Sequence, residues 1–346
     1  MEITLDLPQA RTRPTPGAAY AELKSTITRA GLLERRYGYY LWRALASYGI
    51  LALGLVLPFV NSNRVASVAA GLLIGFGLVQ VGLIGHDAGH LQIFRGTRKN
   101  WFIGLLAWTV TSGVAFWYWY DRHTRHHANT NDVQRDPDLA GGGMVAYSAE
   151  EAQARSGWSR TFAKYQAYLA PLFLLFLMIF VFYMQAEGWV YVLRRLRGRR
   201  RALELALLVT HAALYASPFF VLGLRWVWIF VLSQMVAGVY LGLIVAPNHK
   251  GMPVWAQGTV PSFMERQVLS SRNVRAHPVW DFIYGGLNYQ IEHHLFPTMP
   301  RPNFKRAQAI IRPFCLERGL TYEEMDPWAS YRAAYDELRR VGLAAA

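Results

Sequence analysis

Residues 65–90 read VASVAAGLLIGFGLVQVGLIGHDAGH, an apolar run that ends in two histidines. The part from Val65 to Gly85 carries no charged side chain and is long enough to cross the hydrocarbon core of a bilayer. His86 and His90 follow it four residues apart, so on a helix both imidazoles share one face. The stretch therefore predicts a membrane-spanning helix that presents two metal-binding side chains at its end.

The composition of the whole chain is that of an integral membrane protein. Of its 346 residues, 53% are hydrophobic and only 17% are charged. We therefore predict an all-α, multi-pass membrane protein with about four transmembrane helices in two hairpins, together with interfacial or re-entrant helices. The predicted spans are residues 39–60, 65–85, 203–222 and 226–246.

Two further apolar runs are predicted not to cross the membrane. A single crossing by residues 101–120 would place His90 and His123 on opposite faces, so we expect an in-plane or re-entrant segment there. The run 165–192 ends at residues 194–201, which contain six arginines, a pattern typical of the cytoplasmic side. Since its other end adjoins the histidine groups, we expect a dipping or surface-lying helix pair.

Charge gives the orientation and the expected partners. The net charge of +14 gathers beside the apolar runs, which favours a lipid bilayer over nucleic acid as the basic surface's partner. Only Arg64 and Arg225 of 36 basic residues lie in the outer links, so both termini are expected in the cytoplasm. The one cysteine, Cys315, excludes a disulfide framework within the chain and a thiolate metal cluster.

We expect one membrane domain over residues 1–346. It comprises a cytosolic N-terminal segment (1–38), a membrane region with cytosolic histidine loops (39–247) and a cytosolic helical cap that holds the metal site (248–346).

Eight of the ten histidines fall into four short groups next to these apolar runs. The expected ligands are His86, His90, His123, His126, His127, His249, His293 and His294. One tetrahedral zinc ion takes at most four protein ligands, so eight histidines suit two metal ions. The other two differ: His211 is expected as a hydrogen-bonded core residue and His277 as a surface residue.

Several polar neighbours leave alternatives open. Gln290 stands where a ninth nitrogen ligand would lie; it is a weak metal ligand, a group that orders a metal-bound water, or a helix cap. Ligating imidazoles usually donate their second N–H to a polar group, and the candidates are Asp87, Asn131, Asp132, Asp136, Asp138, Asn248 and Glu292. For any single one of them, turn or cap chemistry is the favoured interpretation, and residues 136–138 have the pattern of a turn.

The three groups 86–90, 123–127 and 290–294 resemble the three histidine boxes of membrane fatty acid desaturases. Residues 287–297, LNYQIEHHLFP, are similar to the front-end branch, whose third box begins with glutamine. Residues 246–253, APNHKGMP, resemble an additional ligand segment of bacterial members. The resemblance covers about residues 20–340. The chain departs from many front-end enzymes because its first 37 residues contain no histidine, so no fused haem domain with a His-Pro-Gly-Gly motif is expected.

The resemblance implies an enzyme that uses O2 and two iron ions to introduce a cis double bond into a fatty acyl chain carried by CoA, acyl-carrier protein or a lipid. It also implies a bacterial cytoplasmic membrane, with the site facing the cytoplasm. The chain has neither a Gly-x-Gly-x-x-Gly fingerprint nor a ferredoxin cysteine set. Electrons are therefore expected from a separate ferredoxin or a cytochrome/flavin reductase system.

Other functions stay open at this stage. A related di-iron membrane hydroxylase, epoxygenase or acetylenase would have the same histidines. A membrane zinc protease would use residues 86–90 as a variant of His-Glu-x-x-His, but Asp87 replaces the glutamate base and the remaining histidines go unexplained. A haem-binding carrier would place its histidines near the middle of the bilayer, whereas these lie at span ends.

Overall fold

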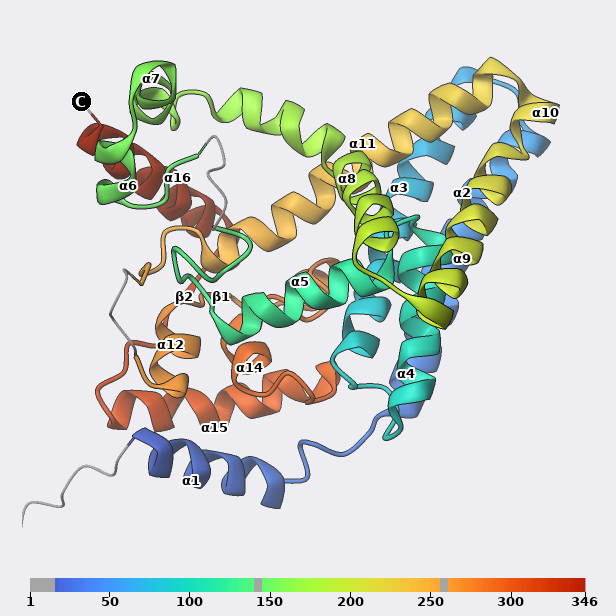
Figure 1. Cartoon of the computed structure of the whole chain (residues 1–346). Coiled ribbons are helices and arrows are strands. Elements are labelled where there is room, and N and C mark those ends of the chain that lie inside the picture. The colour runs from blue at the N-terminus through green and yellow to red at the C-terminus, as the bar shows by residue number, and fades with distance from the viewer. Residues whose placement is uncertain (1–15, 140–144, 256–260, 346) are drawn as a thin grey trace, which may run out of the picture.

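The computed structural model describes residues 16–139, 145–255 and 261–345 (Figure 1). Helices make up nearly all of the regular structure in these ranges. The strands described are two residues long, β1 (Asn273–Val274) and β2 (Glu324–Met325), and they pair in parallel. The prediction of an all-α fold is confirmed.

The first predicted hairpin is formed by α2 (Tyr37–Val60) and α3 (Arg64–Gly89). Asn63 begins α3, because its side chain accepts a hydrogen bond of 2.7 Å from the backbone N–H of Ala66. Glycines on α3 allow close packing on both sides: Gly77 lies against Leu51 of α2, and Gly75 lies against Ser233 in the second hairpin.

The second hairpin consists of α9 (Gly198–Ala216), the short α10 (Phe219–Leu222) and α11 (Leu224–His249). Together with α8 (Ala170–Arg194), the structure has five helices in the described residues that are long and apolar enough to cross a membrane. The prediction of a helix pair at residues 165–192 is wrong, since α8 is one continuous helix packed against α11. After Pro171 in its first turn, no glycine or proline occurs before Gly188, so nothing in the sequence interrupts the helix.

Residues 97–128 form a sharp corner. α4 (Thr97–Gly104) continues into the π-helix η1 (Leu105–Thr111), and α5 (Phe116–Ala128) leaves at an angle of 115°. Gly113 at the corner has φ +70°, the left-handed region that favours glycine. The bend agrees with the predicted in-plane or re-entrant segment, because both ends stay on the side of the histidine groups.

The remaining helices form a cap beside the ends of α3, α5 and α11 (Figure 1). They are α1 (Pro16–Arg29), α6 (Ala149–Ala154), α7 (Gly157–Tyr165), α12 (Phe263–Leu269), α13 (Pro278–Ile283), α14 (Gln290–Leu295), the 3₁₀ turn η2 (Arg301–Asn303), α15 (Phe304–Glu317) and α16 (Pro327–Ala344). The predicted amphipathic helices near 303–318 and 328–340 correspond to α15 and α16. In Figure 1, α1 runs alongside α15, so the N-terminal helix belongs to the cap.

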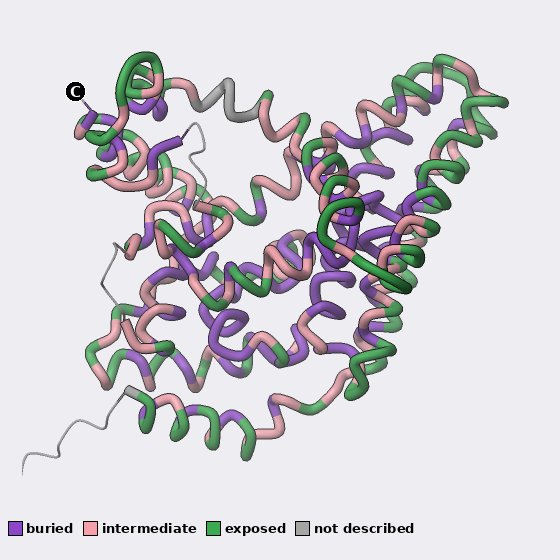
Figure 2. Tube along the Cα trace, viewed as in Figure 1, coloured by how far each residue is buried: buried purple, intermediate pink, exposed green. Residues whose placement is uncertain are grey.

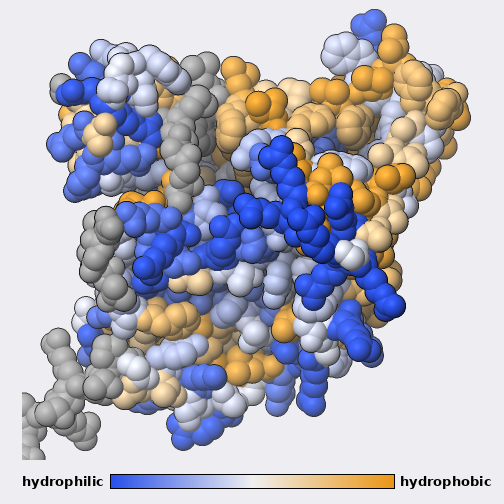
Figure 3. Space-filling model, in the orientation of Figure 1, coloured by the Kyte–Doolittle hydropathy of each residue, from blue (hydrophilic) through white to orange (hydrophobic). Residues whose placement is uncertain are grey.

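Burial and hydropathy separate the membrane part from the cap. Figure 2 shows the outer sides of α2, α9 and α10 exposed, and Figure 3 shows the same upper right region as hydrophobic. Large apolar side chains of α2, α10 and α11 are exposed, with Leu45 67%, Phe220 86% and Trp228 75% exposed. Hydrophilic side chains dominate the middle and lower parts of the view. A surface so apolar is stable only against lipid, so the protein is a multi-pass membrane protein.

Candidate metal centre

Four elements bring the eight predicted ligand histidines together. His86 lies in the last turn of α3 with His90 as its C-cap, and α5 carries three more histidines in its C-terminal half. His249 is the last residue of α11, and α14 carries the final pair. The separated stretches meet in the structure, because their rings contact one another across these elements.

The first cluster contains His86, His90, His123 and His293, and one ring nitrogen from each lies within 4.8 Å of the others. Nε2 of His86 is 3.1 Å from Nε2 of His123. Nε2 of His90 is buried and has no hydrogen-bond partner among the described residues. A buried polar atom of this kind needs a partner, and a metal ion at the centre of the cluster would supply it.

The second cluster contains His126, His249 and His294, again with one ring nitrogen from each within 4.8 Å of the others. Nε2 of His126 is 3.4 Å from Nε2 of His249, and Nε2 of His294 is buried without a hydrogen-bond partner among the described side chains. Three imidazoles on different elements are a suitable donor set for a divalent transition metal.

His127 lies between the two clusters. Its Nε2 is 3.2 Å from Nε2 of His123 and 3.1 Å from Nε2 of His293. Its ring stacks on that of His294 with centroids 4.1 Å apart. Two nitrogens that each lie about 2.1 Å from one ion are separated by about 3.0–3.4 Å at octahedral or tetrahedral angles. The observed spacings therefore fit two adjacent metal ions.

Three ring orientations are fixed by hydrogen bonds at the opposite nitrogen. Nδ1 of His126 is 3.0 Å from both carboxylate oxygens of Asp136. Nδ1 of His249 lies 2.8 Å from the carbonyl oxygen of Ser270, and Nδ1 of His294 lies 2.8 Å from Oε1 of Gln267. Each acceptor holds a proton on Nδ1 and so leaves Nε2 as the lone-pair donor that faces the cluster.

Asp87 orients the first cluster. One of its oxygens is 3.2 Å from Nδ1 of His86, and the other forms a buried ion pair of 2.6 Å with Arg301. Arg301 also donates to the carbonyl oxygen of Leu83 at 2.6 Å. The ion pair thus joins the end of α3 to the cap.

Burial keeps the last histidine pair neutral. It lowers the pKa of His293 and His294 well below the usual value, and neighbouring imidazoles add to the effect. A neutral ring is the form that binds metal, so this pair does not have to lose a proton at neutral pH.

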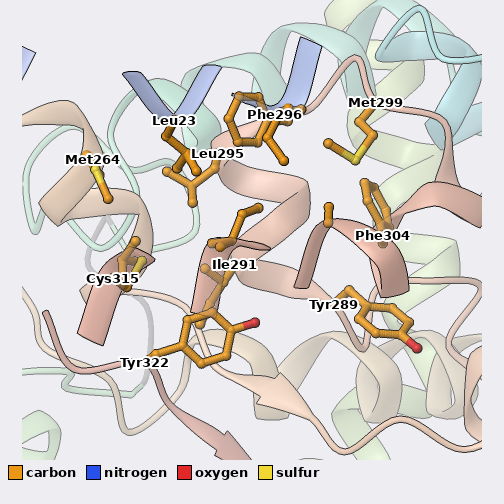
Figure 4. Packing of buried hydrophobic residues seen from close by; sticks show 14 of the residues in the cluster. Leu23, Met264, Tyr289, Ile291, Leu295, Phe296, Met299, Phe304, Cys315 and Tyr322 are labelled. Atoms are coloured by element: carbon orange, nitrogen blue, oxygen red, sulfur yellow. The ribbon is translucent and has the colours of Figure 1, made fainter. Parts of the chain in front are cut away.

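α14 is held in place by a core that surrounds it completely. All six of its residues are buried. Figure 4 shows Ile291 and Leu295 among apolar side chains of the cap, which include Leu23 of α1 and Phe304 of α15. The buried Glu292 accepts hydrogen bonds from the hydroxyl of Tyr322 at 2.5 Å and from Asn273 at 2.7 Å, and burial raises its pKa to about 7.

Gln290 turns its amide nitrogen toward the second cluster, 2.8 Å from Nε2 of His249. Its amide oxygen accepts a hydrogen bond of 3.1 Å from Asn248. The side-chain nitrogen of Asn248 also lies 3.2 Å from the carbonyl oxygen of Ile244 and 3.1 Å from that of Leu287, so its two N–H groups face three acceptors. Gln290 thus lines the second cluster beside His249.

The other polar neighbours divide between the site and the turns. Asn131, with φ +57°, donates to the carbonyl oxygens of His249 and Pro253 and so shapes the chain after α11. Asp138 lies 3.5 Å from Nδ1 of His126 but pairs mainly with Arg122 at 2.9 Å.

Some functional partners were not among the sites favoured from the sequence. The sequence favoured Asp136 as a turn residue, but it has two roles. It accepts a hydrogen bond from the backbone N–H of Asp138, and it contacts the ring of His126. Gln267, Ser270 and Arg301 have no signal in the sequence, because they lie far along the chain from the histidines that they contact.

The two remaining histidines lie outside both clusters. His211 is a buried residue whose Nδ1 lies 2.9 Å from the carbonyl oxygen of Val110, as predicted for a hydrogen-bonded core residue. His277 is exposed and accepts a hydrogen bond from the N–H of Val279 at the start of α13, which confirms the surface prediction.

Comparisons with known proteins agree with this geometry. The chain is 28% identical over 320 residues to a Delta(8)-fatty-acid desaturase of Euglena gracilis, an alignment that covers 89% of this chain and 75% of that protein. It is 26% identical over 337 residues to a Delta(6)-fatty-acid desaturase of Caenorhabditis elegans, covering 93% and 74%. A Delta 8-(E)-sphingolipid desaturase of Kluyveromyces lactis is 29% identical over 328 residues, covering 88% and 55%. A family model described as fatty acid desaturase matches residues 62–325, and since that match takes in most of the sequence, this protein belongs to the fatty acid desaturase family.

Proposed function

We propose that the two histidine clusters hold a pair of iron ions and that the protein uses them, with O2, to introduce a cis double bond into a fatty acyl chain. Membership of the desaturase family implies an iron-dependent, O2-using oxidoreductase. The observation that carries the proposal is the arrangement of eight imidazoles in two adjacent clusters at the ends of membrane helices.

In this proposal His86, His90, His123 and His293 bind one iron, and His126, His249 and His294 bind the other. His127 would join the first set, because its Nε2 lies 3.2 Å from Nε2 of His123 and 3.1 Å from Nε2 of His293. Bound iron supplies the power to break unactivated C–H bonds, which no side chain provides. The protein holds the ligands and turns their lone pairs inward.

The electron donor and the acyl carrier are further parts of the proposal. A separate ferredoxin or cytochrome/flavin reductase delivers the electrons to the face that carries the cap. We infer that this face is cytoplasmic, because the arginine-rich link between α8 and α9 and the basic N-terminus of α4 lie at the same ends of the membrane helices as the histidines. The carrier is CoA, acyl-carrier protein or a membrane lipid; relatives named acyl-lipid (9-3)-desaturases support the last. A bacterial cytoplasmic membrane stays a prediction.

The test is expression in a host of defined lipid composition together with a reductase partner, followed by mass spectrometry of CoA-, carrier-protein- and lipid-bound acyl chains. We expect a new acyl chain two mass units lighter, and two iron atoms for each purified protein. A hydroxylated, epoxidised or acetylenic product would instead identify the protein as a hydroxylase, epoxygenase or acetylenase with the same site. Zinc, or a haem absorption band, would contradict the di-iron assignment.

Variants test the ligand set directly. His126→Ala and His293→Ala are expected to abolish the product and to lower bound iron, because each removes a ring nitrogen from one cluster. The matched control is His277→Ala, an exposed histidine outside both clusters, which should keep its activity. Full iron content in the first two variants would refute the assignment.

A further inference from the structure

The buried face of α9 is polar, although the helix lies in the membrane region. Among its described side chains only Glu204, Leu208 and His211 are buried, and their spacing places them on one face. The rest of α9 is largely exposed (Figure 2). Ionisable side chains are expensive inside a membrane and usually serve a function there. Neither Glu204 nor His211 belongs to the metal clusters.

Glu204 contacts the beginning of the helix that carries the second histidine group. Its Oε1 accepts a hydrogen bond of 2.7 Å from the backbone N–H of Phe116, the first residue of α5, and another of 2.6 Å from the hydroxyl of Thr109 in η1. The first N–H groups of a helix have no partner within it, and no water is present in a membrane to replace one. Glu204 therefore caps α5 from a different helix.

His211 holds the other side of the same corner. Its Nδ1 lies 2.9 Å from the carbonyl oxygen of Val110, so the ring donates to a backbone acceptor that the bend leaves free. A Cβ on Gly113 would lie 2.4 Å from Nε2 of His211, so the absence of a side chain there lets the ring approach. Gln185 of α8 donates to the carbonyl oxygen of Ser112 at 2.9 Å, so α8 takes part as well.

α9 also contacts the first turn of α5 through a cation–π pair. The guanidinium of Arg200 lies 4.7 Å from the ring centroid of Trp117. Arg200, Glu204 and His211 thus attach α9 to the corner at three successive levels. The first ligand on α5, His123, stands two turns beyond this anchored end, and a short helix transmits a tilt at one end to the other.

We propose that Glu204 and His211 are positioning residues, which fix the corner between η1 and α5 and thereby place His123, His126 and His127 in the metal clusters. The proposal rests on the ligand set proposed above. It gives α9 a role beyond crossing the bilayer, because these polar contacts attach it to η1 and to the first turn of α5.

The experiment measures the position of α5 without relying on activity. The single natural cysteine, Cys315, is buried, so nitroxide labels can be attached to Arg125→Cys on α5 and Lys305→Cys on α15, both at exposed sites. Double electron–electron resonance on the whole protein in nanodiscs then reports the distance between α5 and the cap. We expect Glu204→Leu to shift or broaden this distribution and to lower iron affinity about 10- to 100-fold.

Two matched variants separate positioning from packing. Glu204→Gln keeps the carbonyl oxygen that accepts from Phe116 and Thr109, so it should restore both the distance and the iron content. Leu208→Ala removes apolar volume from the same face of α9 but no hydrogen bond, and should leave the distance unchanged. An unshifted distance in Glu204→Leu, or an equal shift in Leu208→Ala, would overturn the proposal.

The outcomes also distinguish this proposal from the ligand assignment. If Glu204→Leu moves α5 while the iron content stays full, Glu204 does position α5. In that case α5 does not supply ligands, and the site proposal fails. If His126→Ala loses iron while Glu204→Leu keeps both its distance and its iron, the ligand set holds and the positioning role is rejected.

Discussion

At the scale of single residues, Gly113 decides the course of the chain between η1 and α5. Its φ of +70° costs other residues roughly 1–2 kcal/mol, and the ring of His211 occupies the space of a side chain. We therefore expect Gly113→Ala to lower thermal stability in detergent by more than this strain alone and to reduce bound iron.

The control for this variant is Gly49→Ala in α2. Gly49 is exposed, and a Cβ there meets nothing within 4 Å. Alanine at that helical position should stabilise the protein by about 0.5–1 kcal/mol. Equal melting temperatures for the two variants would show that the corner tolerates a side chain.

Asp136 gives a second prediction at this scale. It is fully buried and contacts Nδ1 of His126 with both oxygens, so Asp136→Asn should weaken metal binding about 10- to 100-fold. Asp138→Asn is the matched control, because the Asp138 side chain is 41% exposed and pairs with Arg122. Metal titration of both variants checks the difference, and a larger loss in Asp138→Asn would reverse the assignment.

The sequence indicated the proposed ligand histidines but not most of the side chains that hydrogen-bond to them, and the reason is physical. Helical spacing of three or four residues places imidazoles on one face, so His86 with His90, and His123 with His127, could be grouped without a structure. The partners Gln267 and Arg301 reach the clusters only through tertiary packing. Asp136 was visible, but a carboxylate in a turn is usually explained by the turn alone.

At the scale of elements, the contact between α3 and α11 affects where His86 and His249, two of the proposed ligands, lie. A Cβ on Gly75 would be 2.6 Å from the carbonyl oxygen of Ser233, a backbone atom that cannot turn aside. Gly75→Ala should therefore force the helices apart and destabilise the protein by about 1–3 kcal/mol. Thermal unfolding in nanodiscs measures the loss.

Gly82→Ala, on the same helix, provides the comparison. The nearest atom to its added Cβ is on Trp108 at 3.6 Å, which is an ordinary contact. Its melting temperature should stay close to that of the parent protein. Similar losses in both variants would mean that α3 is intolerant of alanine in general and that the contact with α11 is not decisive.

Element boundaries followed from the sequence where polar residues interrupt apolar runs, as at Asn61–Asn63 and Gly223. α8 could not be predicted in this way. One end of this apolar run adjoins the histidine groups and the other adjoins the arginine-rich link, so both ends were expected in the cytoplasm. That expectation favoured two short helices over one that crosses the membrane. An uninterrupted apolar helix forms regardless of where its ends lie, because its backbone groups satisfy one another.

At the scale of the whole molecule, metal binding should stabilise the fold, because the proposed ligands come from α3, α5, α11 and α14. A ligand that binds only the folded state adds about 2.7 kcal/mol when its concentration is 100 times the dissociation constant. We expect removal of iron by a chelator to lower the melting temperature, and re-addition of ferrous ion to restore it. In His126→Ala the chelator should have a smaller effect, and an equal drop would place the stabilising metal elsewhere.

The overall architecture was predictable because a bilayer permits few solutions. Apolar length indicated both hairpins, and amphipathic periodicity indicated α15 and α16. The packing of the cap helices against one another and against the ends of the membrane helices was not predictable. It depends on buried contacts between distant segments, such as the ion pair of Asp87 with Arg301 and the hydrogen bond from Tyr322 to Glu292.

The place of α14 along the chain has a consequence for biosynthesis. When the ribosome has made residues 1–292, the nascent protein already contains all of its long apolar helices but only six of the eight imidazoles. Each cluster then lacks one member, His293 in the first and His294 in the second. We therefore expect the long apolar helices to enter the membrane before either cluster is complete.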